Sequence, residues 1–304
     1  MLPAVFRDRM RMLNSNRSVY LEKSSGEKEK QERNMRATVL VDNIGNDTIQ
    51  GEWGLSFYIE YGDRKLLLDA GASGLFAENA QKLGLSLEEV DYAVLSHAHY
   101  DHADGMCVFL DRNTRARLYL RDACRENCYR IKEGGWKYIG IQEGFLEKYR
   151  DRLVYVSGDL EITKGVWLIP HRTSGLERAG RREKMYLRED GKWITDCFAH
   201  EQSLVFDTPE GLVIFNSCSH GGADTVICET KKVFPGRKVR ALIGGFHLHN
   251  KTEQYVREIS ARIRETGVEE VFTGHCTGEE AFYVMKEELG NKAHQLRAGL
   301  QMDF

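Results

Sequence analysis

The sequence places four residues of metal-ligating types within six positions: His97, His99, Asp101 and His102. Imidazole nitrogens and carboxylate oxygens are the ligands that Zn, Fe and Mn use in sites without thiolates. The group directly follows an apolar segment, residues 92–96, whose sequence YAVLS predicts a strand. On a turn that leaves a strand, the first two histidines can face one metal, and the aspartate and the last histidine can face a second. The spacing therefore predicts a metal site, and isolated surface histidines are the alternative interpretation.

The elements that must position this group alternate between strands and helices from Ala37 onward. Short runs rich in Val, Ile, Leu, Tyr and Phe, bounded by Gly, Asp or Asn, predict strands at 37–42, 55–61, 65–69, 92–96, 153–156, 166–170, 203–207, 211–217, 239–245 and 271–274. Helices are predicted at 73–83, 103–111, 121–132, 223–233, 252–266 and 278–289. Early hairpins, later strand–helix alternation and no internal repeat predict an α/β fold, with two mixed β-sheets sandwiched between helices.

Length and composition limit the class of protein. At 304 residues and 41% hydrophobic, the chain is long and apolar enough to bury a core. Its 43 basic and 46 acidic residues give a net charge of -3, which disfavours a nucleic-acid partner. No apolar run approaches the ~18 residues that span a bilayer, so no membrane association is expected. The 7 cysteines form no C-x-x-C pair and the N-terminus has no apolar signal segment, so we expect reduced thiols in a cytoplasmic protein.

The sequence divides into an extension and one domain. Residues 1–34 are polar and highly charged, which is typical of a disordered tail or of a start codon assigned too far upstream. Residues 35–304 are expected to form the domain, in which the Gly-rich, charged residues 121–200 are a cap or substrate loop. This loop carries a basic cluster that suits a phosphate or carboxylate on a substrate, and a solvated charged loop is the alternative. The members of the cluster are Arg172, Arg178, Arg181, Arg182 and Lys184.

The group at 97–102 resembles the H-x-H-x-D-H signature of the metallo-β-lactamase superfamily. The resemblance runs from about Met35 to the C-terminus, and LLLDAG around Asp69 resembles the superfamily's early Asp-x-Gly turn. The later segments NSCSHGG, IGGFHLH and TGHCTGEEA are similar to one branch, named for 7,8-dihydropterin-6-yl-methyl-4-(β-D-ribofuranosyl)aminobenzene 5′-phosphate synthase. The resemblance implies an αββα sandwich of two mixed β-sheets flanked by helices, with two divalent metals. Zn is the expected metal, and the ligand types also suit Mn and Fe.

The resemblance also implies ligands at later strand ends. His220 and His275 each follow a predicted strand where a Gly-rich turn begins, and both resemble ligand positions of the superfamily. A hydrogen-bonded or surface histidine is the alternative for each. His247 follows a strand too, and is expected to be a ligand, a substrate contact or a support for a ligand. His200 and Glu201 compete for one ligand position before a hairpin, with an ordinary loop end as the alternative for both.

Other residues are expected to act beside the ligands. Asp101 is the expected catalytic carboxylate that ligates a metal and orients water, and Asp69 is expected to support the ligand loop unless it is a plain turn carboxylate. His171 and Arg172 are expected to contact substrate. Many superfamily members bridge their metals with an aspartate, but the corresponding turn here holds Cys218, which we expect to be a packed thiol. Without a bridging ligand, two metals need not bind equally.

Three functions fit these residues. The first is a metal-dependent hydrolase that attacks an anionic, phosphate-containing small molecule with a metal-activated hydroxide. The second is a transferase like the branch's namesake, in which an arylamine displaces diphosphate from a pterin. Aromatic residues would then stack near the site, and the candidates are Trp136, Tyr138 and Trp193. The third is a non-catalytic metal-binding module, which the near-complete ligand set disfavours. The expected partner is a small anion, and a homo-oligomer is compatible with the sequence.

Overall fold

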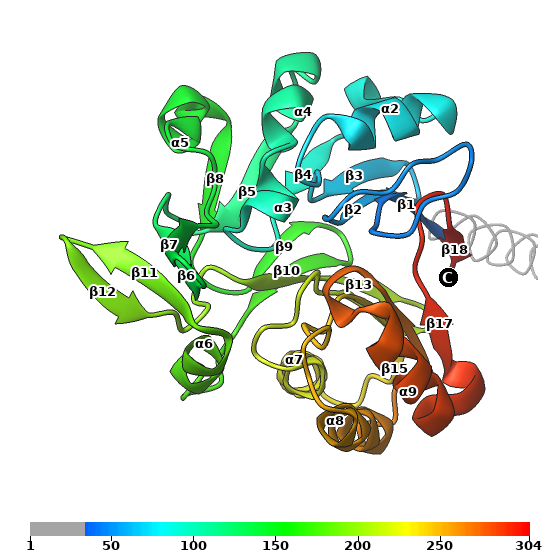
Figure 1. The fold of residues 1–304 in the computed structure, drawn as a ribbon. Coiled ribbons are helices and arrows are strands. Elements are labelled where there is room, and N and C mark those ends of the chain that lie inside the picture. The colour runs from blue at the N-terminus through cyan, green and yellow to red at the C-terminus, as the bar shows by residue number, and fades with distance from the viewer. Residues whose placement is uncertain (1–33) are drawn as a thin grey trace, which may run out of the picture.

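Two large β-sheets form the centre of the fold in a computed structural model that describes residues 34–304 (Figure 1). The first sheet contains, in spatial order, β18 (Gln301–Asp303), β1 (Met35–Val41), β2 (Ser56–Tyr61), β3 (Arg64–Leu68), β4 (Tyr92–Val94), β5 (Arg117–Arg121) and β8 (Leu153–Val156). Strands β18, β1, β2 and β3 pair antiparallel, whereas β3, β4, β5 and β8 pair parallel. The sheet is therefore mixed, as the sequence predicted.

The second sheet is also mixed. It contains, in spatial order, β17 (Ala293–Gln295), β16 (Glu270–Thr273), β15 (Val239–Gly244), β14 (Gly211–Phe215), β13 (Gln202–Thr208), β10 (Val166–Pro170) and β9 (Leu160–Thr163). The strands from β14 to β17 are parallel, so each connection must cross back over the sheet. The crossing helices are α7 (Ala223–Val233), α8 (Glu253–Glu265) and α9 (Glu279–Leu289).

Apolar side chains divide the fold into four layers. In β3, Leu66 and Leu68 pack between the two sheets with Phe206, while Leu67 points the other way and packs with Phe76. Helices α2 (Leu75–Lys82) and α4 (Met106–Arg112) cover this outer face of the first sheet, and α7, α8 and α9 cover the second sheet. The αββα sandwich predicted from the sequence is confirmed. None of the helices in residues 34–304 is long and apolar enough to cross a membrane.

A smaller, four-stranded sheet projects from one side of the sandwich (Figure 1). It contains, in spatial order, β12 (Lys192–Thr195), β11 (Met185–Glu189), β6 (Cys128–Lys132) and β7 (Gly135–Tyr138). Within residues 34–304 the remaining helices are α3 (Tyr100–Ala103), α5 (Phe145–Lys148) and α6 (Glu177–Glu183), with 3-10 turns at Leu87–Glu89, Arg150–Arg152, His275–Thr277 and Gly290–Lys292. The expected loop at 121–200 is thus mostly regular structure, and β8, β9 and β10 within it belong to the two large sheets.

The helix predicted at 121–132 is wrong, because this segment ends in strand β6. Gly134 and Gly135 have φ angles of 98° and 115°, which L side chains rarely adopt, and they turn the chain back into β7. Ile131 then pairs with Trp136 across the hairpin. The glycine pair therefore ends any helical pattern and begins a hairpin. The extension expected at 1–34 lies, apart from its last residue, outside the described residues.

Candidate metal centre

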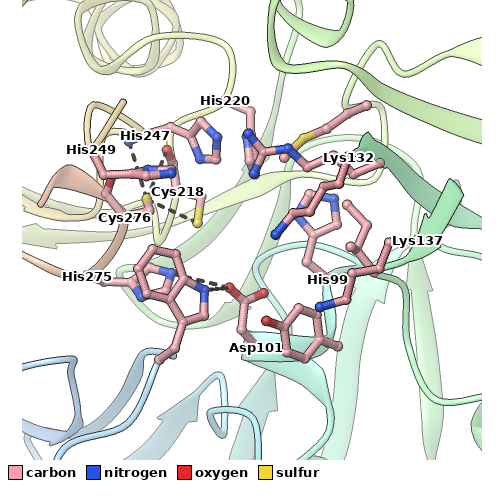
Figure 2. A pocket seen from close by; sticks show the side chains of 15 residues that line it. His99, Asp101, Lys132, Lys137, Cys218, His220, His247, His249, His275 and Cys276 are labelled. Carbon is pink, nitrogen blue, oxygen red and sulfur yellow. Dashed lines mark hydrogen bonds and ion pairs between the residues drawn. The ribbon is translucent and has the colours of Figure 1, made fainter. Parts of the chain in front are cut away.

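Loops that leave four different strands bring the predicted ligands together. His99 and Asp101 follow β4, His220 follows β14, His247 follows β15 and His275 follows β16. These five side chains line one cavity of about 290 Å³, and Figure 2 shows them pointing into it from opposite walls. Two further predicted ligands, His97 and His102, lie fully buried behind the lining. The structure therefore places the expected metal-ligating residues in a single cluster.

The first group of nitrogens belongs to His97, His99 and His220. One ring nitrogen from each lies within 4.8 Å of the others, which is the spacing that a shared metal ion requires. The Nε2 atoms of His97 and His99 and both ring nitrogens of His220 are buried without a hydrogen-bond partner. A buried polar atom without a partner is costly, so this arrangement fits the binding of a cation.

The second group consists of Asp101, His102 and His275. His275 Nε2 lies 3.6 Å from Asp101 Oδ2, and the His102 and His275 rings have centroids 5.0 Å apart. His275 Nε2 is another buried atom without a hydrogen-bond partner. Trp53, which the sequence analysis did not single out, donates from Nε1 to Asp101 Oδ2 at 2.8 Å. The same carboxylate oxygen, Oδ2, thus faces both Trp53 and His275.

Hydrogen bonds on the far side of each imidazole orient the ring. His102 Nδ1 lies 2.8 Å from Asp69 Oδ2, and His275 Nδ1 lies 3.0 Å from Asn43 Oδ1. Because both oxygens are acceptors, each Nδ1 carries the proton and each Nε2 presents a lone pair. Asp69 also accepts from the backbone N–H and the hydroxyl of Ser96 at 2.7 Å, and Ser96 Oγ lies 2.8 Å from His97 Nδ1. Asp69 therefore supports the ligand loop from behind.

Burial keeps most of these imidazoles uncharged. It lowers the pKa of His97, His99, His220 and His275 well below the usual value, and neighbouring imidazoles lower it further. A neutral imidazole can ligate a metal, whereas a protonated one cannot. These four imidazoles are thus in the protonation state that metal binding needs.

The turns that carry these ligands are strained. Asp69, Ser219, His247 and His275 have φ angles between 45° and 56°, in the left-handed region that non-glycine residues seldom occupy. Each of these four residues lies just after the end of a strand that leads into the cluster. Such strain persists only where the surroundings enforce it, and it is typical of functional sites.

His200 and Glu201, which compete for one predicted ligand position, lie in different surroundings. His200 has both ring nitrogens engaged: Nδ1 accepts from the Ala98 N–H at 3.2 Å, and Nε2 lies 3.1 Å from Asp196 Oδ2. Glu201 Oε2 accepts from the backbone N–H of His220 at 3.2 Å. Neither side chain is among those that line the cavity. Glu201 instead supports the His220 turn, and His200 is a packed, hydrogen-bonded residue.

His247 lies at the cavity, as expected, beside an acidic residue. Its Nε2 lies 3.3 Å from Glu183 Oε2. Burial opposes the charged imidazole, but hydrogen bonding to Cys276 and then to Glu183 raises the pKa of His247 to about 9. A protonated imidazole has no free lone pair, so this charged state does not suit direct metal ligation.

The two expected substrate contacts, His171 and Arg172, do not lie among the cavity-lining residues. His171 is 5% exposed and sits between two carboxylates, with Nε2 3.0 Å from Glu201 Oε1 and Nδ1 2.8 Å from Glu229 Oε2. Arg172 is exposed and pairs with Asp159. The expectation is corrected because the loop after β10 turns toward α7, where Glu229 accepts from the Arg172 backbone N–H at 2.7 Å.

The basic residues that do line the cavity are Arg130, Lys132 and Lys137 on the β6–β7 hairpin. Arg130 pairs directly with Lys137 across the hairpin, and Lys132 lies two residues along β6, so all three share one face of the small sheet. Figure 2 shows Lys132 and Lys137 on the wall opposite His275. The alternating pattern R-x-K before the glycine pair is the sequence signal that could have indicated this basic face. It was missed because the segment was predicted to be a helix.

Residues 54–173 match the family model of the metallo-beta-lactamase superfamily. The chain is 27% identical over 287 residues to the 7,8-dihydropterin-6-methyl-4-(beta-D-ribofuranosyl)-aminobenzene-5'-phosphate synthase of Methanocaldococcus jannaschii, covering 88% of this chain and 95% of that protein. The crystal structure of Tm1679, a metal-dependent hydrolase of the beta-lactamase superfamily, aligns with a TM-score of 0.77 and 29% identity over 89% of this chain and 99% of that one. Zn(2+)-bound PqqB from Methylobacterium extorquens shares the fold, with a TM-score of 0.56 and 11% identity over 88% and 100% of the two chains.

Proposed function

We propose that this chain is a metal-dependent hydrolase of the metallo-β-lactamase superfamily that acts on an anionic small molecule. The observation that carries the proposal is the cluster of buried imidazole nitrogens without hydrogen-bond partners around one cavity. Binding a divalent cation offsets the cost of burying those nitrogens. The similarity to a metal-dependent hydrolase over nearly the whole of that chain supports the same assignment.

Two metal positions follow from the two groups of ligands. His97, His99 and His220 would hold one metal, and Asp101, His102 and His275 would hold the other. Nitrogen and oxygen ligands suit Zn, which we propose here, as well as Mn and Fe. When bound, such metals lower the pKa of water toward ~7 and polarise the bond under attack.

The chain's own residues would set the geometry of the reaction. Trp53 fixes one oxygen of Asp101, so the other oxygen can accept a proton from the attacking water. Asp69 fixes the tautomer of His102 and, through Ser96, the orientation of the ligand loop. Both effects hold the reacting groups in place before the substrate binds.

The charge of the cavity wall supports an anionic substrate. Arg130, Lys132 and Lys137 place three cationic groups on the hairpin that faces the ligands. Guanidinium and ammonium groups bind phosphate and carboxylate oxygens through charge-assisted hydrogen bonds. A phosphate ester is the substrate class that uses both the cationic hairpin and the metals.

We expect the Lys132→Ala, Lys137→Ala double variant to raise KM for an anionic substrate about tenfold or more, with a smaller change in kcat. The lysines would hold an anionic group of the substrate and not the reacting bond, so binding suffers more than turnover. Steady-state kinetics with the best phosphodiester substrate provide the measurement. Lys192→Ala on β12 is the matched control, because this exposed lysine lies in the same small sheet away from the cavity lining. An unchanged KM in the double variant would remove the hairpin from the binding site.

Turnover of a panel of phosphate monoesters and diesters by the full, Zn-loaded chain tests the hydrolase assignment. We expect hydrolysis that a chelator abolishes and added Zn restores. Protein that binds its metals but hydrolyses none of the panel would contradict the assignment. The transferase would then be the leading function.

The transferase remains the second candidate because of the similarity to the synthase. Trp136 and Trp193, two of the expected stacking residues, stack on each other with ring centroids 3.5 Å apart and do not line the cavity. The hydroxyl of Tyr138 donates to the Ile141 carbonyl. The aromatic side chains that line the cavity are instead Trp53 and Tyr100. Release of diphosphate from a pterin diphosphate, dependent on an added arylamine, distinguishes this function from hydrolysis.

A further inference from the structure

Cys218 occupies the junction between the two metal positions. Its Sγ lies 3.2 Å from His102 Nε2, and it lies within 4.8 Å of a ring nitrogen of His97 in the same group. The same sulfur also lies within 4.8 Å of ligand atoms of His220 and His275.

The six proposed ligands around Cys218 carry little negative charge. Asp101 is the one carboxylate among the six proposed ligands, and the other five are imidazoles. Two divalent cations in a buried site are stabilised by anionic ligands, because the low-dielectric surroundings screen their repulsion poorly. The turn after β14 reads Asn216-Ser217-Cys218-Ser219-His220 and supplies no carboxylate. A thiolate is the single anionic ligand that this turn can provide.

The surrounding backbone holds Cys218 in place. Ser219 has a φ of 47°, and its N–H donates to Asn216 Oδ1 at 2.7 Å. Asn216 Nδ2 in turn donates to Ser203 Oγ at 2.9 Å, so the turn is tied to the neighbouring strand. His220, two residues after the cysteine, is 3% exposed, and both of its ring nitrogens are unpaired in the cluster. The sulfur and the unpaired imidazole thus share one rigid turn.

A second thiol, that of Cys276, lies directly behind the first. Cys276 Sγ lies 3.4 Å from Cys218 Sγ and is placed to donate an S–H hydrogen bond to it. Gly245 makes room for this sulfur, because a Cβ on that residue would come within 2.5 Å of Cys276 Sγ. Donors to a metal-bound thiolate stabilise its charge and tune the metal.

We propose that the Cys218 thiolate is the ligand shared by the two metals, with the thiol of Cys276 as its hydrogen-bond donor. Metal binding at Cys218 then releases the Sγ proton to solvent. The inference rests on the metal centre of the proposed function and adds a soft ligand to it. Soft thiolate ligands favour Zn and Co over Mn, so Mn is expected to bind more weakly than Zn.

The test is the absorption spectrum of the full chain loaded with Co(II), together with its cobalt content. The wild type is expected to show a thiolate-to-cobalt charge-transfer band in the near ultraviolet. Cys218→Ser is expected to lose the band, and Cys276→Ser, the matched control, is expected to keep it with a shifted maximum. Cys218→Asp is expected to retain both cobalt ions without the band, because a carboxylate can take the bridging place.

Each outcome separates this inference from the proposed function. Wild-type protein that binds about two cobalt ions without the band would overturn the thiolate ligand while leaving the metal centre intact. A band that Cys276→Ser abolishes and Cys218→Ser preserves would identify Cys276 as the thiolate ligand, and it would also overturn the inference. Failure of the wild type to bind cobalt or zinc would instead remove the metal centre itself.

Discussion

Replacing His97 with alanine should lower metal-dependent turnover by about a thousandfold or more. His97 is fully buried, and its Nε2 is one of the unpaired atoms that face the first metal position. Alanine removes that nitrogen from the first metal position. Initial rates with the best phosphate ester, measured at matched zinc concentrations, give the comparison.

The control for this prediction is His294→Ala. His294 lies on β17, where its ring stacks on Phe272 with a centroid distance of 4.5 Å and takes no part in the cavity lining. Both variants remove one imidazole, so a difference between them reports the site and not the loss of a histidine in general. If turnover of the His97 variant stays within about tenfold of wild type while folding is intact, His97 is not a ligand of a catalytic metal.

The His171→Ala variant should lose about 3–5 kcal/mol of its free energy of unfolding near neutral pH. Burial opposes the charged imidazole, but the carboxylates of Glu201 and Glu229 outweigh it and raise the pKa of His171 to about 10. The protonated ring therefore lies between two buried negative charges, at 3.0 Å and 2.8 Å. Alanine leaves those carboxylates without their cation. Urea unfolding followed by circular dichroism measures the loss.

The pH dependence of this loss identifies its cause. The pKa of His171 is higher in the folded state than its unfolded value of about 6.5, so its stabilisation is complete below about pH 6.5. It is lost as the pH rises through about 10. The difference between wild type and variant should therefore be larger near about pH 6 than near about pH 9. His249→Ala, which removes an exposed imidazole at the cavity, serves as control. Equal losses at both pH values would contradict a charged His171.

The strand ends explain why much of the site could be predicted. His220 and His275 each follow an apolar run that stops at polar residues, and such a stop marks the end of a strand. The parallel pairing of β14, β15 and β16 then carries the residues after each strand to one edge of the sheet. The order in which these strands lie side by side depends on packing between distant segments. No local sequence pattern indicates that order.

The residues that escaped prediction depend on contacts between distant segments. His171, Glu201 and Glu229 come from three separate parts of the chain and meet through buried hydrogen bonds. A histidine placed between two carboxylates from distant segments leaves no pattern in the local sequence. The sequence alone therefore predicts that His171 contacts substrate. The cationic face of the β6–β7 hairpin was overlooked for a different reason, since residues 121–132 also suit a helix. Only the turn at Gly134 and Gly135 resolves that ambiguity.

Elemental analysis of the purified full chain, with His220→Ala and His275→Ala beside it, tests the metal centre most directly. The two variants each remove a ligand from a different group, so each should lose metal from its own position first. We expect about two metals per chain in the wild type, with zinc predominant, and fewer in both variants. Less than about half a metal per wild-type chain, not restored by added Zn or Mn, would contradict the centre and leave the buried imidazoles without a function.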